Sequence, residues 1–453
     1  MYSCGPTVYD FVHIGNFRTF LMADFLRRAF EYSGYQVKHI KNITDVGHLT
    51  QDDIEAGEDK MIKAAKREKK NPYDIARFYE KAFHQDENKL NILPAREFPR
   101  ATEYIKEMIA MIEKLIADGY AYEINGSVFY DIEKFKDYGK LSGNTLENLK
   151  VGARLEKHPD KKNHYDFALW LKADPSHIMQ WDSPWSRGYP GWHIECSAMS
   201  IKNLGETLDI HTGGEDNTFP HHEDEIAQSE GATGKKFVNY WVHGRHLLVD
   251  GKKMSKSKGN FYVLADIKKR GFNPLSFRYL CLTTHYQSQL NFTWKSLEAS
   301  ENALNKLYDF MTILPPDKGG LREVNSPLTP TISYKERELN SPLERSKGHV
   351  YEEKFRKALE NNLDTPKALA TVWEMIKSKE LNYDDKKTSL LKFDQVLGLG
   401  LDKVRKEKTK MPEKIKELIK QREEARKNKN WQKADELRDK IKKEGYAIQD
   451  TPV

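Results

Sequence analysis

Four side chains of kinds that bind transition metals stand at the boundaries of predicted elements. Each lies at the end of a predicted strand or the start of a predicted helix: Cys4, Cys196, His221 and Glu225. The four-residue spacing of His221 and Glu225 would place both on one face of a helix. Two thiolates, an imidazole and a carboxylate suit Zn²⁺ and leave room for an exchangeable ligand. Because the chain has no Cys-x-x-Cys pair, two interpretations stay open: a zinc site, or small buried cysteines beside a polar helix start.

A phosphate site is indicated close to the N-terminus. Tyr2 and Ser3 resemble the end of a strand, Gly5-Pro6 interrupts it, and His13-Ile14-Gly15-Asn16 opens a helix. A strand, a tight turn and a helix N-terminus together present backbone N–H groups to a phosphate. Taken alone, this tetrapeptide is more often an ordinary helix start.

A lysine-rich loop is the third candidate for chemistry. Residues 253–258 alternate lysine with serine, apart from Met254, and precede Gly259-Asn260. Such a cationic loop, rich in donors, suits a triphosphate. A solvated lysine turn would show the same pattern, so the loop alone leaves both interpretations open.

The composition limits the class of protein. A chain of 453 residues is too long for one core and should form three or more units. Three cysteines cannot build a disulfide framework and favour a reducing cytoplasm. The sequence contains no apolar run of about 18 residues, so no membrane span is predicted, and no secretory signal is visible. The chain begins inside an apparent strand, so an earlier strand is expected before Tyr2.

The chain alternates predicted helices and strands. A helix should end near Gly34, a strand should cover Val37–Ile43, and residues 44–48 should follow at its carboxyl end, where open α/β sheets bind ligands. Asn71-Pro72 should begin another helix. A hairpin over residues 120–132 turns at Asn125-Gly126 and belongs to an insertion between two halves of a nucleotide-binding sheet. Further on, Pro220 should start a helix, residues 314–348 should be a linker, and helices should run from Glu352 to Leu397.

The end of the chain is basic. Residues 403–444 hold 17 Lys/Arg against 9 Asp/Glu, a local net charge of +8. Two amphipathic helices are predicted there, and their basic faces could be a solvated surface or an RNA contact. For Trp431, a core anchor of the second helix is favoured over base stacking.

These residues carry a resemblance to a known family. His13-Ile14-Gly15-Asn16 resembles the HIGH signature of class I aminoacyl-tRNA synthetases, and residues 253–257 match their KMSKS loop. Cys-Gly-Pro-Thr-Val-Tyr-Asp, Asn-Ile-Thr-Asp-Val, Gly-Trp-His-Ile-Glu-Cys-Ser-Ala-Met and Phe-Pro-His-His-Glu-Asp-Glu-Ile-Ala-Gln-Ser resemble cysteinyl-tRNA synthetases specifically. The likeness covers nearly the whole chain.

The resemblance implies roles for particular residues. The zinc ligands would be Cys4, Cys196, His221 and Glu225. The catalytic residues would be His13, Asn16, Lys253 and Lys256. ATP would contact His13, Gly15, Asn16, Gly214, Asp216 and Lys256. The amino-acid pocket would contain Thr44, Trp192 and His211. Asn16 stands where the signature has its second histidine, and residues 215–218 are more polar than is usual in the family.

The implied architecture is α/β, with a Rossmann-type parallel-sheet nucleotide-binding domain, an inserted connective domain, a helical bundle and a small basic C-terminal domain. The catalytic domain would occupy residues 1–97 and 188–235, and the connective domain residues 98–187. The KMSKS and stem-contact region would cover 236–300, the linker and tRNA-binding bundle 301–400, and the anticodon-recognition domain 401–453.

The implied activity is ATP-dependent ligation of L-cysteine to its tRNA through cysteinyl-adenylate. Zn²⁺ would select the thiolate, and Mg²⁺ would accompany ATP. We expect a cytoplasmic monomer with no membrane partner. Two alternatives remain: the related ligase that joins cysteine to an amino-sugar in mycothiol synthesis, and a catalytically silent RNA-binding protein with structural zinc. The first should not need the basic tail, and an intact lysine loop argues against the second.

Overall fold

A parallel four-stranded sheet organises the N-terminal half of the computed structural model. The structure describes residues 1–47, 49–51, 56–151, 160–255, 259–312, 347–404, 413–428 and 430–443. These form two compact units, Met1–Asp402 and Lys403–Val453. Lys256 and most of the predicted linker therefore lie outside the described residues.

The sheet has the order β11-β10-β1-β2, and every neighbouring pair is parallel. Its strands are β1 (Tyr2–Ser3), β2 (Ile40–Lys41), β10 (Leu208–Gly214) and β11 (Val238–Gly244). β1 lies at the centre and pairs with β10 through Tyr2↔His211 and Ser3↔Thr212. Parallel strands bring their carboxyl ends to one edge, so the segments after β1, β2 and β10 meet there. The predicted strand Val37–Ile43 is wrong in extent, because Ile43 instead forms an isolated bridge with Arg100.

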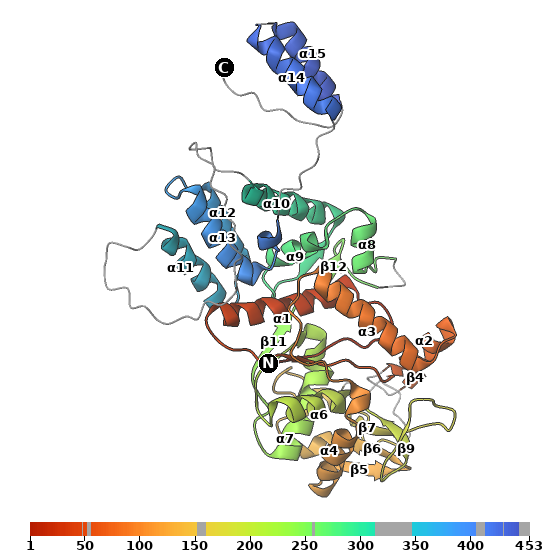
Figure 1. The fold of residues 1–453 in the computed structure, drawn as a ribbon. Coiled ribbons are helices and arrows are strands. Elements are labelled where there is room, and N and C mark those ends of the chain that lie inside the picture. The colour runs from red at the N-terminus through yellow and green to blue at the C-terminus, as the bar shows by residue number, and fades with distance from the viewer. Residues whose placement is uncertain are drawn as a thin grey trace. The chain divides into compact units, whose positions relative to one another are not determined.

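Helix α1 (Ile14–Tyr32) runs through the middle of the first unit (Figure 1). Its buried face includes Phe17, Leu21 and Phe25, which recur every four residues on one side of the helix. It contacts β10 and β11 on one side and helices α9 and α13 on the other. α1 therefore joins the sheet to the helical region that follows it in the chain.

The inserted segment builds its own antiparallel sheet, in the order β5-β6-β7-β9-β8. Its elements are α4 (Ile105–Ala117), β5 (Ala121–Ile124), β6 (Ser127–Tyr130), α5 (Leu146–Val151), β7 (Phe167–Lys172), β8 (Trp181–Asp182) and β9 (Arg187–Pro190). The predicted hairpin is confirmed: Asn125 and Gly126 both have positive φ, 53° and 88°, as a type I′ turn requires. This sheet packs in one core with α6 (Trp192–Leu204) and α7 (Glu223–Thr233).

The start of α7 differs from the prediction of a helix from Pro220. Residues 218–222 form a wide turn in which Phe219 is extended (φ −142°, ψ 133°), and α7 begins at Glu223. The residue before a proline disfavours the α conformation, which accounts for the interruption at Phe219.

The remaining elements of the first unit flank the sheet and α1 (Figure 1). Two short strands and two helices follow β2: β3 (Leu49–Gln51), β4 (Ala56–Asp59), α2 (Lys60–Glu68) and α3 (Pro72–Lys89). A small sheet and two helices come before and after the lysine loop in the sequence: β12 (Leu247–Val249), β13 (Lys252–Lys253), β14 (Leu290–Phe292), α8 (Leu264–Lys269) and α9 (Pro274–Leu282). The later helices are α10 (Trp294–Thr312), α11 (Lys347–Glu360), α12 (Thr365–Lys377) and α13 (Tyr383–Leu397). Asn71 caps α3 ahead of Pro72, as predicted.

In the part of the second unit that the structure describes, two helices pack together, α14 (Glu413–Lys427) and α15 (Trp431–Lys443). The prediction that Trp431 anchors α15 in a core is wrong, since its side chain is 54% exposed; Ala434, Leu437 and Ile441 are buried instead. Trp431 is the first residue of α15, so its side chain lies beyond the apolar stripe of that helix. Within the described residues, we find no helix with the length and apolarity needed to cross a bilayer.

Candidate active site and metal centre

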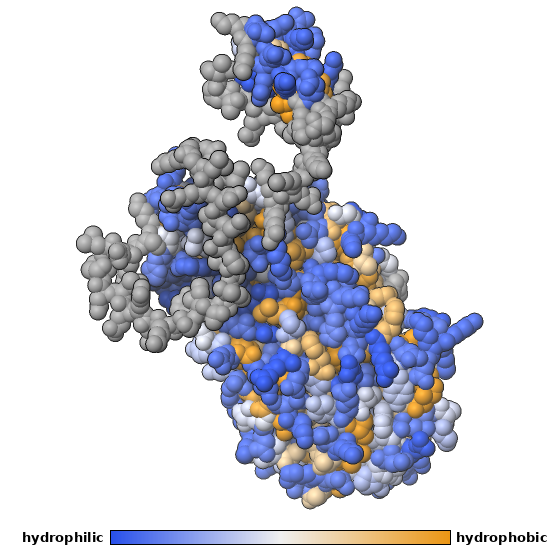
Figure 2. Space-filling view, in the orientation of Figure 1, coloured by the Kyte–Doolittle hydropathy of each residue, from blue (hydrophilic) through white to orange (hydrophobic). Residues whose placement is uncertain are grey.

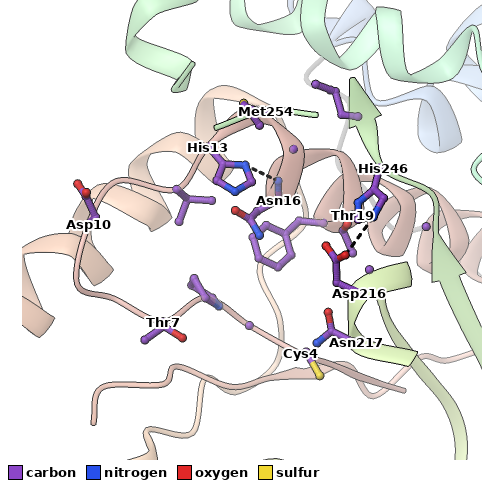
Figure 3. Close-up of a pocket in the computed structure, with 18 of the residues that line it drawn as sticks. Cys4, Thr7, Asp10, His13, Asn16, Thr19, Asp216, Asn217, His246 and Met254 are labelled. Atoms are coloured by element: carbon purple, nitrogen blue, oxygen red, sulfur yellow. Dashed lines mark hydrogen bonds and ion pairs between the residues drawn. The ribbon is translucent and has the colours of Figure 1, made fainter. Parts of the chain in front are cut away.

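The start of α1 forms one wall of a cavity of about 510 Å³. His13 is the N-cap of α1, and its Nδ1 accepts a hydrogen bond of 3.2 Å from the Asn16 N–H. The Ile14 N–H donates to the Tyr262 carbonyl at 3.0 Å, which fixes this helix start against the chain that follows the lysine loop. A Cβ on Gly15 would approach the His13 ring and Met254 to about 3 Å. Glycine is therefore what lets Met254 lie over the first turn, as the close-up shows (Figure 3).

The cavity gathers most of the predicted nucleotide residues. Its lining includes His13, Gly15, Asn16, Gly214, Asp216 and Lys253, together with Cys4 and Trp192. Asp216 enters from the turn after β10 and pairs with His246, Oδ1 to Nε2, at 3.0 Å (Figure 3). The structure thus brings the helix start and the beginning of the lysine loop to one space, while the position of Lys256 is outside the described residues.

Arg18, one turn into α1, holds this arrangement together. Its guanidinium is 5% exposed and donates to the carbonyls of Arg245 and His246 at 2.7 and 2.6 Å, and also to that of Ser288. These carbonyls precede the strands β12 and β14. Arg18 therefore ties the helix start to the small sheet that carries Lys253.

The four predicted metal ligands lie together. The donor atoms of Cys4, Cys196, His221 and Glu225 all fall within 4.8 Å of one another. The two sulfurs are 3.9 Å apart, and His221 Nε2 is 3.1 Å from Glu225 Oε1. Zn–S bonds of about 2.3 Å in a tetrahedral site place two sulfurs at nearly this separation. The kinds of donor and their spacing fit Zn²⁺.

The electrostatics of this cluster also favour a cation. Burial, then the neighbouring Cys196 and Glu225, raise the pKa of the Cys4 thiol well above its ordinary value. The hydrogen bond from Cys4 lowers the pKa of Cys196 to about 7. Burial lowers the pKa of His221, but its bond to Cys196 and the Glu225 charge outweigh this and raise it to about 9. Several acidic groups packed away from water repel one another, and a divalent cation would relieve that repulsion.

A second set of donors overlaps the first. Cys4 and Glu225 also meet His211 and His222 within the same 4.8 Å limit. His222 Nε2 lies 3.4 Å from Cys4 Sγ, and its Nδ1 shares a hydrogen bond of 2.7 Å with His243 Nε2. Burial and four surrounding imidazoles hold the pKa of His222 well below its ordinary value. Only the first set supplies two thiolates. Zinc binds these soft donors more strongly than hard cations such as Mg²⁺ or Ca²⁺ do.

Two of the three residues predicted for the amino-acid pocket, Trp192 and His211, contact the cluster. Trp192 begins α6 and stacks on His221, with ring centroids 4.5 Å apart. His211 of β10 is buried, with Nε2 3.0 Å from Glu225 Oε2. Thr44 is also buried, and its hydroxyl donates to Glu195 Oε2 at 2.8 Å. Trp192 is the one of the three that lines the described cavity.

The sequence prediction missed several histidines of this site. His193 shares a 2.8 Å hydrogen bond with His221, Nδ1 to Nδ1, and its Nε2 lies 3.2 Å from Asp224 Oδ2. Asp224 in turn accepts a hydrogen bond from the Tyr138 hydroxyl of the inserted segment at 2.5 Å. The only sequence signal for these contacts is that His222 directly follows His221 and that His193 directly follows Trp192.

The chain resembles known protein families and curated proteins over nearly its whole length. A family model described as "tRNA synthetases class I (C) catalytic domain" matches residues 1–302, and one described as "Cysteinyl-tRNA ligase anticodon binding domain" matches residues 408–452. The chain is 43% identical to the cysteine–tRNA ligase of Treponema denticola, over 99% of this chain and 93% of that protein. It is 41% identical to the cysteine–tRNA ligase of Thermus thermophilus, over 100% of this chain and 93% of that protein.

The fold has solved counterparts. Methionyl-tRNA synthetase of Mycobacterium tuberculosis, solved in complex with methionyl-adenylate, aligns with a TM-score of 0.56 over 88% of this chain and 89% of that one. At 14% identity this likeness concerns the fold alone. The family models and the full-length relatives go further: the chain belongs to the cysteine–tRNA ligases, a family of class I aminoacyl-tRNA synthetases.

Proposed function

We propose that this enzyme joins L-cysteine to its tRNA in two steps within the cavity described above. The cysteine carboxylate attacks the α-phosphorus of ATP, giving cysteinyl-adenylate and pyrophosphate. A terminal ribose hydroxyl of the tRNA then attacks the cysteinyl carbonyl, and AMP leaves. The observation that carries the proposal is the position of Cys4, which belongs to the four-donor cluster and also lines the cavity beside His13 and Asn16.

The chain's own residues position the reactants and stabilise charge on the phosphates. The start of α1 offers a positive helix end, and Lys253 adds a cation to the lining of the same cavity. We assign Lys256 to the phosphates as well, with Mg²⁺ entering as part of the ATP substrate. Gly214 and Asp216 would contact the adenosine. Holding the carboxylate in line with the α-phosphorus is the other main contribution of the protein in reactions of this kind.

Selection of cysteine falls to the donor cluster. Zinc held by Cys4, Cys196, His221 and Glu225 would bind the substrate thiolate and disfavour the harder hydroxyl of serine. Trp192 stacks on His221, and His211 contacts Glu225, so both would orient ligands as well as border the substrate. A pocket that selects by size alone discriminates by roughly 10- to 200-fold per methylene group, which is too little without editing. Chemical recognition of the thiol selects more strongly and makes editing unnecessary.

The C-terminal unit favours tRNA over an amino-sugar as the acceptor. Residues 403–453 form a separate unit, and most of it matches an anticodon-binding model. A ligase acting on a small sugar has no use for such a unit. We therefore assign anticodon recognition to the C-terminal unit, and the enzyme would act as a monomer in the cytoplasm, where free Cys4 and Cys196 stay reduced.

Two assays test the proposal. Pyrophosphate exchange should depend on cysteine and reject serine, and the purified enzyme should then charge total tRNA with cysteine. Exchange with cysteine but transfer only to an amino-sugar would support the sugar ligase. Zinc-free protein that still prefers cysteine over serine would contradict the proposed means of selection.

A further inference from the structure

Two exposed phenylalanines form a continuous surface at the rim of the cavity. Phe11 lines the cavity and is 44% exposed, and Phe78 of α3 is 47% exposed. Their rings meet edge to face, with centroids 6.2 Å apart. Phe11 also packs edge to face on the buried Tyr79 at 5.1 Å, which holds its ring in place. We call this pair the Phe11–Phe78 surface.

The stretch of chain that carries Phe78 bears a net positive charge. Between residues 66 and 81 the exposed cations are Lys66, Arg67, Lys69, Lys70, Arg77 and Lys81. Among the acids of that stretch, Asp74 is exposed, Glu68 is half-buried and Glu80 is buried. Glu68 pairs with Arg67 and Lys70, and Asp10 pairs with Arg67 at 3.6 Å, which leaves Lys66, Lys69, Arg77 and Lys81 as the other exposed cations. The Lys70 ammonium lies 4.9 Å from the centre of the Phe78 ring. The projecting end of α2, where this stretch begins, is accordingly hydrophilic in the space-filling view (Figure 2).

Aromatic faces set among cations suit one kind of polymer in particular. Single-stranded nucleic acid stacks its bases on exposed aromatic rings while its phosphates pair with lysine and arginine. An acidic peptide would use the charge but leave two aromatic rings without a matching partner. A membrane surface would need a broader apolar face than one pair of rings.

The reaction itself supplies the nucleic acid. The terminal ribose of the tRNA must enter the cavity, so the unpaired nucleotides just before it must cross the cavity's rim. We propose that the Phe11–Phe78 surface binds these unpaired 3′ nucleotides by base stacking, and that the cations of residues 66–81 contact their phosphates. This inference rests on the proposed use of tRNA as the acceptor and assigns part of the acceptor's path to α2 and α3.

Substitution of Phe78 gives a clean test, because its ring is exposed and does not line the cavity. Phe78→Ala should leave cysteine-dependent pyrophosphate exchange and the melting temperature unchanged. It should lower kcat/KM for tRNA by roughly 5- to 150-fold, the range for loss of one base–aromatic stack. Phe78→Trp should retain charging. Tyr240→Ala, which removes a 70% exposed aromatic from β11, is the matched control and should behave as the wild type.

A fluorescent probe separates stacking from charge. A tRNA transcript carrying 2-aminopurine at an unpaired 3′ position should be quenched by the wild type and by Phe78→Trp, but not by Phe78→Ala. Lys81→Ala should keep the quenching. It should make the slope of log affinity against log salt concentration shallower by about the amount that one phosphate contact contributes.

Equal charging by Phe78→Ala and the wild type would overturn the proposal. Quenching that persists in Phe78→Ala would do the same, because it would place the bases elsewhere. A wild-type enzyme that performs pyrophosphate exchange but charges no tRNA would instead refute the proposed acceptor, which is a separate failure.

Discussion

At the scale of single residues, the choice between His221 and His222 decides what kind of metal site this is. Cys4 and Glu225 belong to both donor sets, but only the set with His221 includes Cys196. Soft thiolates select zinc, and a second thiolate strengthens that selection. We therefore expect Cys196 and His221 to be essential for metal binding, and His222 to act from outside the coordination shell.

Metal analysis of matched variants tests this expectation. The wild type should contain about one zinc per chain, and His221→Ala should lose most of it. His222→Ala should keep the metal, with affinity reduced by roughly 10- to 100-fold at most, as for residues that orient ligands. Cys281→Ala removes a buried thiol outside both donor sets and serves as the control. Zinc retained in His221→Ala and lost in His222→Ala would identify the other donor set.

Lys256 is predicted to act on the transition state of adenylation. Lys253, Met254 and Ser255, which begin the lysine loop, line the cavity, and we expect Lys256 of the same loop to act on the phosphates. Lys256→Ala should slow pyrophosphate exchange by an amount equivalent to about 3–4 kcal/mol, with little change in cysteine binding. Lys252→Ala, at an exposed position of β13, is the comparison. Unchanged exchange kinetics in Lys256→Ala would mean that the loop is only a surface turn.

Residue types predicted the main donors, but not the network around them. Cys4, Cys196, His221 and Glu225 could be chosen because few residues of those kinds stand at strand ends and helix starts. His193 and His243 could not, because a single histidine in a sequence carries no sign of the partner that the fold will bring to it. Tyr138 reaches Asp224 from an inserted segment 86 positions away, a contact that no local pattern encodes.

At the scale of elements, Arg278 of α9 joins three parts of the first unit. Its guanidinium is fully buried, pairs with Asp24 of α1 at 2.6 Å, and donates to the carbonyls of Leu90 and Leu397. Arg278→Met should destabilise the protein by about 3–5 kcal/mol, because it leaves the Asp24 charge buried with only part of its compensation. Urea unfolding would measure the loss. Lys357→Ala breaks an exposed pair with Glu353 and should cost at most about 1 kcal/mol.

α3 carries a pH-dependent contribution to stability through His84. Burial lowers the pKa of His84, but Glu80 and Glu87 outweigh it and raise the pKa from 6.5 to about 9. Because the folded pKa is the higher one, the contribution is complete below 6.5 and disappears as the pH rises through about 9. His84→Ala should therefore reduce the free energy of unfolding most at about pH 6 and least at about pH 10. A constant difference across that range in urea titrations would show that only packing is lost.

Elements with strong local signals were predictable, and elements shaped by tertiary contacts were not. The Asn125-Gly126 turn and the Asn71-Pro72 helix start follow from backbone preferences of those residues. The strand at Val37–Ile43 is shorter than its β-branched residues suggest, because its far end pairs with a loop instead of a strand. Trp431 lies outside its helix's buried stripe, which periodicity over one short helix could not decide.

At the scale of the whole molecule, the residues proposed for adenylation and those proposed for anticodon recognition belong to different units. The cavity and the donor cluster lie within Met1–Asp402, whereas α14 and α15 belong to Lys403–Val453. Residues 403–444 carry a net charge of +8, which suits a polyanion. If the second unit binds tRNA, its affinity should fall steeply with salt, and the slope should report the number of phosphates contacted.

A chain that ends at Asp402 should therefore separate the two half-reactions. Cysteine-dependent pyrophosphate exchange should be nearly unchanged, because every described residue assigned to it precedes the cut and the first unit keeps its internal contacts. Charging of tRNA should drop sharply, and the salt dependence of the remaining tRNA affinity should flatten. In the full-length chain, Trp431→Ala tests base stacking separately from charge in this unit. It removes an exposed aromatic ring without opening a core and leaves the charge of the unit unchanged. Equal tRNA charging by the truncated and full-length enzymes would show that recognition of the tRNA resides entirely in the first 402 residues.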